Sequence, residues 1–196
     1  MNQEDFYKIK EQFGYCGSWA IWSEPKDKPK SNIGDLSILD PSINKNLLNQ
    51  INPKVVFVAL NFSRSTIKAD FANFHDDRPM SQDYKIRYAL SKTKLWGGYM
   101  TDIIKNFPEK SSNKMMSILK ENKKIELENC KTFIREIKLL KSNNIKIIAF
   151  GNDAYNILER NFHNEFDITK VPHYANYINK DKYRESFLSL SQNLTI

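Results

Sequence analysis

The stretch VVFVALNFSRS, residues 55–65, begins as an apolar strand and ends on Asn61, followed by an aromatic and small polar residues. Its β-branched and aromatic side chains are typical of a buried strand. A strand-end asparagine is most often a turn former. In an open parallel sheet, however, ligands bind outside the carboxyl ends of the strands, so Asn61 is also the first candidate for a functional residue.

Three further apolar runs follow along the chain, separated by charged segments with helical spacing. One of these segments, Ile125–Lys141, has apolar residues every three or four positions and is predicted to be an amphipathic helix. Strand-like runs that alternate with helices predict a parallel α/β sheet of four strands. The four runs are KVVFVAL (54–60), LWGGYMTDII (95–104), IKIIAFG (145–151) and FDITKVPHY (166–174).

Length and composition predict a single domain, 1–196, in which residues 1–50 form an N-terminal extension packed beside the sheet. The chain begins with a polar, charged segment and has no apolar run near 18 residues, so we expect a soluble, non-secreted protein without membrane contact. Cys16 and Cys130 lie far apart without CxxC spacing, which predicts a reduced cytoplasmic chain with neither a zinc site nor an iron–sulfur cluster.

The net charge of +7 and the pI near 9.2 favour a polyanionic partner. The 24 Lys, 6 Arg and 21 Asn also match the bias of an AT-rich genome, so charge favours nucleic acid only slightly. A lone His after a strand, as in the 172–177 segment, is more often structural than catalytic. Asn152 or Asp153 is predicted to cap a helix, and His75-Asp76-Asp77 is interpreted as a polar loop in preference to a metal site.

The residues that follow the predicted strands occur in an order that resembles the motif order of the uracil-DNA glycosylase superfamily. VALNFS is similar to the GINPG and GMNPG motif of its mismatch-specific and single-strand-selective branches, with Asn61 at the catalytic asparagine. GGYMTDIIKNFPEKSS resembles YITNVVKCRPP of the thermostable branch, with Asp102 at the base-reading asparagine. VPHYANY resembles HPSPLS, with His173 at the family histidine and Tyr177 at a residue that wedges into DNA. Phe74 stands at the spacing of the aromatic that stacks on the base.

The resemblance extends over residues 54–187 and implies a three-layer α/β/α fold with a central, mainly parallel four-stranded sheet. It implies a monofunctional, cofactor-free DNA glycosylase that is monomeric and carries no metal. Phe62 replaces the family's proline and Ala175 replaces a phosphate-touching serine, while the cluster cysteines of the thermostable branch are absent. Phe62 and Ser63 would border the base. Lys180, Lys182 and Arg184 would meet phosphates, or would simply form a solvated helix face.

Asp102 gives a prediction about the base. An ionised carboxylate only accepts hydrogen bonds, so it suits the exocyclic amine of cytosine and opposes O4 of uracil. Ser63 replaces the tyrosine that crowds C5 in the uracil-specific branch, which leaves space for a C5 substituent. We therefore expect a C5-modified cytosine in foreign (phage) DNA as the substrate and an abasic site as the product.

Three alternatives stay open at this point. The first is a repair glycosylase for uracil or another deaminated base, which requires Asp102 to be protonated or not to touch the base. The second is a catalytically silent member of the fold that only binds nucleic acid or a protein. An unrelated nucleotide-binding α/β domain is the third, although the chain has no GxGxxG motif or P-loop. No lysine is clearly placed as a Schiff-base nucleophile, so strand cleavage is not expected.

Overall fold

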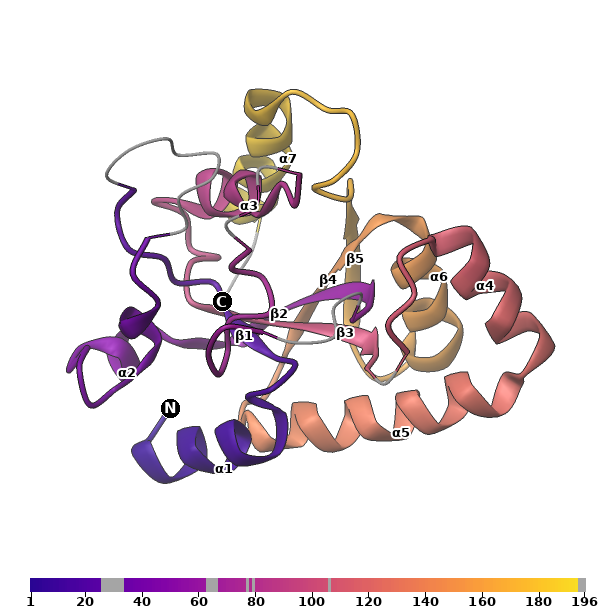
Figure 1. Cartoon of the computed structure of the whole chain (residues 1–196), viewed down its shortest axis with the longest axis horizontal. Helices are drawn as coiled ribbons and strands as arrows, with labels where there is room; N and C mark the ends of the chain where they lie inside the picture. Colours follow the sequence, from indigo (N-terminus) through magenta and orange to yellow (C-terminus); the bar gives the residue numbers. More distant parts are fainter. Residues whose placement is uncertain (26–33, 63–66, 77, 79, 106, 194–196) are drawn as a thin grey trace.

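The computed structural model is an α/β fold built on one mixed sheet, which has five strands within the described residues (Figure 1). The structure describes residues 1–25, 34–62, 67–76, 78, 80–105 and 107–193. The strands are β1 (Ser18–Trp19), β2 (Asn52–Asn61), β3 (Gly98–Ile104), β4 (Lys146–Phe150) and β5 (Asp167–Val171). Their order is β1-β3-β2-β4-β5; β1 pairs antiparallel with β3, and the other neighbours pair in parallel.

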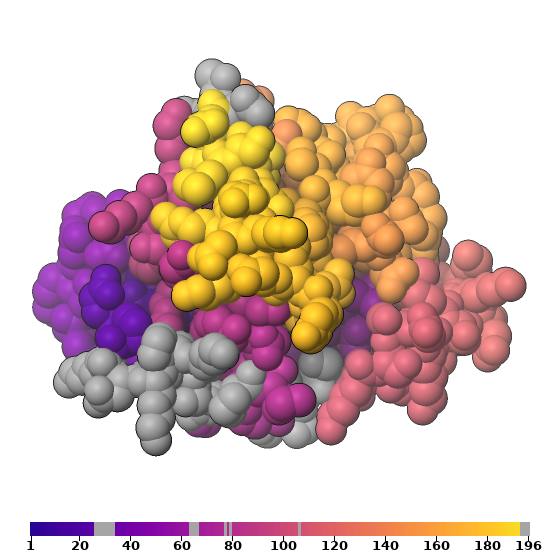
Figure 2. Space-filling model, turned by 90° about the horizontal axis from the view of Figure 1, so that it is seen from above, coloured from indigo at the N-terminus to yellow at the C-terminus, as the bar shows by residue number. Residues whose placement is uncertain are grey.

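Helices cover both faces of this sheet (Figure 1). They are α1 (Gln3–Phe13), α2 (Leu47–Gln50), α3 (Asp83–Leu90), α4 (Ser112–Glu121), α5 (Lys123–Leu139), α6 (Gly151–Phe162) and α7 (Lys180–Asn193), with a short 3-10 helix η1 at Leu36–Leu39. The first core cluster contains side chains of α1, α5 and α6, and the second contains side chains of α3 and α7. Seen from the α7 side, that helix lies across the middle of the molecule (Figure 2). None of the helices in the described ranges is long and apolar enough to cross a bilayer.

The alternation of side chains along β2 explains why both faces need helices. Successive residues of a strand point to opposite faces, and β2 is apolar at every position from 55 to 60. Val56, Val58 and Leu60 belong to the first cluster, and Val55, Phe57 and Ala59 belong to the second. A strand that is apolar on both faces is stable only at the centre of a covered sheet, which is where β2 lies.

All four predicted strands are present, and the predicted helix Ile125–Lys141 corresponds to α5. The prediction of four strands is wrong, because β1 adds a fifth at the β3 edge and makes the sheet mixed. β1 belongs to the first fifty residues, which also supply Phe6, Ile9 and Phe13 to the first core cluster. Two residues are too few to show the two-residue period of a strand, so the sequence pattern could not reveal β1.

The chain connections create a crevice at the carboxyl ends of β2 and β4. After β2 the chain passes through α3, whose apolar side chains lie in the second core cluster, before it enters β3. After β4 it passes through α6, whose apolar side chains lie in the first cluster. Adjacent parallel strands whose following helices cover opposite faces mark a topological switch point, where ligands of open α/β sheets bind.

Candidate active site

A cleft of about 560 Å³ lies at this switch point. Three of the side chains singled out in the sequence line it: Asn61 at the end of β2, Asp102 in β3, and His173 just after β5. The three are 41 and 71 residues apart in the chain, and the parallel sheet brings them together because the carboxyl ends of its strands share one edge.

Asn61 is held in one orientation by the loop that follows β3. Its Nδ2 donates hydrogen bonds to the backbone oxygens of Phe107, at 3.1 Å, and Glu109, at 2.7 Å. Two carbonyl acceptors can be satisfied only by the amide nitrogen, so Oδ1 must point the other way. Within the described ranges Oδ1 has no hydrogen-bond partner. The side chain therefore offers the cleft a fixed acceptor.

His173 offers a donor. The backbone N–H of Ala175 donates to His173 Nδ1 at 3.1 Å, so the proton of the neutral ring lies on Nε2. Burial lowers the pKa of His173 to about 4, which keeps the ring neutral at pH 7. The ring packs close to Gly151, where an added Cβ would lie 3.3 Å from His173 Cβ, and φ at Gly151 is +84°. Both the backbone conformation and the close approach therefore favour glycine at this position.

Asp102 is buried, with 4% of its surface exposed, and its carboxylate lies in the cleft wall. Its Oδ2 accepts a hydrogen bond from Asn73 Nδ2 at 2.7 Å, and the same nitrogen donates to the backbone oxygen of Cys16 at 2.8 Å. A donor fixed on one oxygen sets the plane of the carboxylate and favours its acceptor form. No motif or periodic pattern indicated a role for Asn73 beyond its place beside Phe74.

A buried ion pair lies behind Asp102, on the α5 face of the sheet. Lys105 Nζ is 2.6 Å from Glu136 Oε2, and both side chains are fully buried. Lys105 Nζ also donates to the backbone oxygen of Asp102 at 2.5 Å. Glu136 Oε1 accepts from the hydroxyl groups of Tyr99, at 2.8 Å, and Thr101, at 2.9 Å. This network fixes the β3 backbone at the position that carries Asp102.

The aromatic residues in the cleft lining are Tyr174 and Phe150, and Phe74 is not among them. Phe74 is only 2% exposed, and its ring lies 6.3 Å from the rings of both Phe150 and Tyr174. Tyr174 lines the cleft and stacks on His173 with ring centroids 4.3 Å apart and planes at 23°. Phe74 therefore lies behind the wall that Tyr174 and Phe150 form, and its ring is not exposed for stacking with a base.

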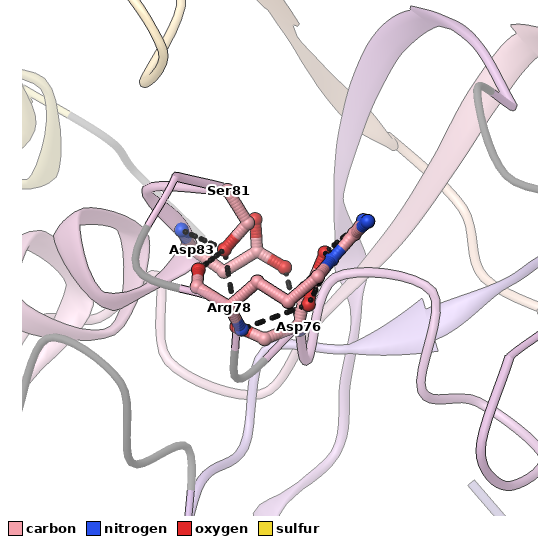
Figure 3. A network of polar contacts seen from close by, with 4 residues as sticks. All are labelled: Asp76, Arg78, Ser81 and Asp83. Atoms are coloured by element: carbon pink, nitrogen blue, oxygen red, sulfur yellow. Dashed lines mark hydrogen bonds and ion pairs between the residues drawn. The ribbon is translucent and has the colours of Figure 1, made fainter.

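A polar loop before α3 forms another part of the cleft wall. Figure 3 shows the polar contacts that hold this loop. Arg78 and Asp76 form an ion pair, with Nη2 2.6 Å from Oδ2. The backbone N–H of Asp76 donates to Asp83 Oδ2 at 2.7 Å, and Ser81 Oγ donates to the backbone oxygen of Asp76 at 3.1 Å. These contacts fold the loop back on the start of α3. Asp77 lies outside the described residues.

The cleft as a whole has an excess of acidic side chains, which the sequence did not predict. Five carboxylates and two cations line it: Asp76, Asp83, Asp102, Glu109 and Asp153, against Arg78 and Lys110. Such a surface attracts a centre that gains positive charge and repels phosphate groups. The electrostatics therefore suit a base and its sugar better than a nucleic-acid backbone.

Two other candidate site residues, Phe62 and Arg184, make contacts within the fold. Phe62 belongs to the first core cluster, 8% exposed, and does not line the cleft. Arg184 donates through both terminal nitrogens to the backbone oxygens of Tyr88 and Ser91, so its guanidinium joins α7 to the end of α3. Ser63, expected beside the base, lies outside the described residues.

The other DNA-binding candidates lie on the surface near the start of α7. Tyr177 is fully exposed, and Lys182 is exposed on α7. Lys180 Nζ lies 4.8 Å above the ring of Tyr88. Tyr177 directly follows Asn176, which lines the cleft.

Two further sequence predictions concern the residues after β4 and the loop before α3. The prediction that Asn152 or Asp153 caps a helix is wrong: α6 begins at Gly151, its N-cap residue is Phe150, and no side chain caps it. Asn152 Oδ1 instead accepts from Lys170 Nζ at 2.8 Å.

His75 is enclosed in the fold, with Nδ1 3.1 Å from Ser18 Oγ and Nε2 2.9 Å from the backbone oxygen of Ile21. In the described part of the chain, no three His, Cys, Asp or Glu side chains converge as metal ligands would.

Comparison of the chain with models of known protein families, with curated proteins and with solved structures gives no match. The resemblance to the uracil-DNA glycosylase superfamily therefore rests on the motif order alone. Function has to be inferred from the cleft and from the chemistry of Asn61, Asp102 and His173.

Proposed function

We propose that the protein is a monofunctional DNA glycosylase that hydrolyses the N-glycosidic bond of a flipped-out, C5-modified cytosine in foreign (phage) DNA and leaves an abasic site. One observation carries the proposal. A fixed acceptor, a neutral donor and a carboxylate, supplied by Asn61, His173 and Asp102, line one cleft at the switch point of the sheet. Their order in the chain is the order of the superfamily motifs that they resemble.

Hydrolysis of an N-glycosidic bond passes through a sugar with positive charge and a base that leaves with negative charge. Asn61 is too weak a base to remove a proton early, but its Oδ1 can accept a hydrogen bond from water and direct the oxygen lone pair at the anomeric carbon. The amide is held by the carbonyl groups of Phe107 and Glu109, so this orientation exists before the substrate binds. The acidic lining of the cleft favours the positive charge that develops on the sugar.

His173 would stabilise the leaving base. Its Nε2–H is a neutral donor suited to O2 of a pyrimidine, where negative charge accumulates as the bond breaks. The first turn of α6 begins at Gly151 in the cleft lining, and the positive end of a helix dipole also favours negative charge. Both contributions are in place before the reaction begins, which is the condition for effective electrostatic catalysis.

The state of His173 gives a prediction about pH. Because burial lowers its pKa to about 4, the ring should stay neutral in the folded protein throughout the range in which an ordinary histidine titrates, near 6.5. The unfolded chain then binds more protons than the folded chain as the pH falls below 6.5. The stability contributed by the neutral ring is present above pH 6.5 and is lost as the pH falls toward about 4.

An NMR titration of the three histidines measures this directly. The signal of His173, assigned by its loss in His173→Gln, should show a midpoint near 4. The acid limb of base release should follow the same midpoint. A His173 midpoint near the ordinary value of 6.5 would contradict the neutral-donor role.

Asp102 would read the base. Its Oδ2 accepts a hydrogen bond from Asn73 Nδ2, which fixes the plane of the carboxylate. In this orientation the carboxylate would act as a hydrogen-bond acceptor for the base. The exocyclic amine of cytosine is a donor at the edge where uracil has the O4 acceptor. Carboxylate against O4 would leave two acceptors facing each other, at a cost of roughly 1–3 kcal/mol. Space at C5 stays a prediction from the sequence, because Ser63 lies outside the described residues.

The substitution Asp102→Asn tests this assignment. The change is nearly isosteric, and it should lower kcat/KM on C5-modified cytosine relative to uracil by roughly 5- to 150-fold, because the amide can donate to O4. Matched oligonucleotides that differ only at the target base, in the same salt, keep the phosphate contacts equal. Asp153→Asn removes one carboxylate from the same cleft and is the control; its discrimination should stay as in the wild type. If both variants change the ratio equally, overall charge and not base reading is responsible, and the uracil-repair alternative gains support.

A further inference from the structure

A second and larger hollow adjoins the cleft. It is a groove of about 1160 Å³ that extends along α3, between Trp22–Pro25 on one side and Ala175–Lys180 on the other. Ala175 and Asn176 line both the groove and the cleft, so the two hollows share a wall. Lys85 Nζ, in α3, donates to the backbone oxygen of Asn176 at 3.2 Å and fixes that wall.

The groove differs from the cleft in its chemistry. Five aromatic side chains from four segments line it: Trp22, Tyr84 and Tyr88 of α3, Trp96 and Tyr177. Its charged lining is mainly basic, with three cations and one carboxylate: Lys85, Arg87 and Lys180, against Glu24. The cleft next to it has five carboxylates and two cations. Lys85 and Arg87 are largely buried, and Lys180 is exposed. The net positive lining favours phosphate groups in the groove over the acidic cleft.

Several of the aromatic rings are held in place by their neighbours. Trp22 and Trp96 pack edge to face with centroids 5.6 Å apart, and Trp22 also stacks on His75 at 4.8 Å. Tyr88 donates to Asp181 Oδ1 at 2.8 Å and lies beneath Lys180. Rigid rings beside cations are the features with which proteins hold single-stranded nucleic acid, because bases stack on the rings while the cations contact the backbone.

We propose that this groove binds single-stranded DNA next to the target nucleotide, so that the backbone lies along α3 and only the target base and its sugar enter the acidic cleft. The orientation of the bound strand, with its target base in the cleft, rests on the proposed function. The proposal specifies that the substrate is unpaired DNA. Bases in a duplex stack on one another and cannot present their faces to Tyr84 or Trp96. Single-stranded DNA therefore binds more tightly than a duplex of the same sequence.

The test uses binding alone, on DNA without any target base. Fluorescence anisotropy of a labelled single strand composed of unmodified bases, and of its duplex, gives the two dissociation constants at one salt concentration. Tyr84→Ala should weaken single-strand binding by roughly 5- to 150-fold, the loss expected for one stacked base. Tyr84→Phe keeps the ring and should bind as the wild type does. Tyr7→Ala, an exposed aromatic on α1, is the control and should also leave binding unchanged.

Lys180→Ala supplies an independent measurement. Loss of one phosphate contact should reduce the slope of log K against log salt by about 0.7. The groove assignment fails if duplex binds as tightly as single strand, if Tyr84→Ala binds as the wild type does, or if no single strand binds at physiological salt, which would favour a protein occupant. No base is released in this assay, so it tests binding separately from the reaction. If the protein binds single strands but fails every glycosylase test, the binding proposal is supported and only the proposed reaction is refuted.

Discussion

Replacement of Asn61 by alanine is expected to lower the rate of base release by at least about 100-fold, since a misplaced nucleophile costs on that order. DNA affinity should change little, because the side chain acts on water and contacts no phosphate in the proposed complex. Single-turnover rates at saturating protein, together with anisotropy for binding, separate the two quantities. The expected pattern is a large loss in the chemical step at nearly constant affinity.

Asn152→Ala is the matched control for this substitution. Asn152 is also an asparagine in the cleft lining, but it lies in the first turn of α6 and its Oδ1 accepts from Lys170. We expect its rate of base release to stay close to that of the wild type. Equal losses of rate and affinity in Asn61→Ala would instead indicate that Asn61 only anchors the loop at Phe107 and Glu109.

Removal of the Glu136 carboxylate should have the largest effect on stability. Glu136→Ala leaves Lys105 fully buried without its counter-ion and is expected to lower the free energy of unfolding by about 3–5 kcal/mol. The hydroxyl groups of Tyr99 and Thr101 lose their acceptor in the same variant. Urea unfolding followed by circular dichroism measures the change.

Two further variants show whether charge burial is the cause. Glu128→Ala breaks the exposed pair with Lys124, whose side chains are 60% and 79% accessible, and should change stability by less than about 1 kcal/mol. Replacing both Lys105 and Glu136 by apolar residues of similar size should recover much of the loss, since no unpaired charge remains buried. A loss below about 1 kcal/mol in Glu136→Ala would show that the interior at this point is not as dry as the packing indicates.

The sheet centre could be predicted because β2, β4 and their neighbours are long enough to show apolar runs between helical segments. β1 could not be predicted, because two residues carry no period. Strand alternation also explains Phe62: it follows Leu60 by two positions, and both side chains belong to the first core cluster. The motif comparison assigned Phe62 to the base, but the two-residue period indicated the core.

The strand-end residues Asn61, Asp102 and His173 could be assigned to one region because carboxyl ends of parallel strands meet at one edge. The hydrogen-bond partners of these residues could not be predicted. Asn73 and the carbonyl groups that orient Asn61 belong to loops, and the course of a loop depends on tertiary packing that no periodic pattern records. The acidic lining was missed for the same reason, because Asp76, Asp83 and Glu109 come from loops or a helix start.

The central claim is tested most directly by incubating the purified protein with single-stranded oligonucleotides that each contain one cytosine, 5-hydroxymethylcytosine, glucosylated 5-hydroxymethylcytosine or uracil. Free base is measured by mass spectrometry and abasic sites by alkaline cleavage, with Asn61→Ala as the inactive control. We predict release of a C5-modified cytosine at least about 5-fold faster than uracil, the smallest ratio expected from one mismatched contact, and no release of unmodified cytosine. Efficient release of uracil without action on any cytosine derivative, or release of no base at all, would contradict the proposal.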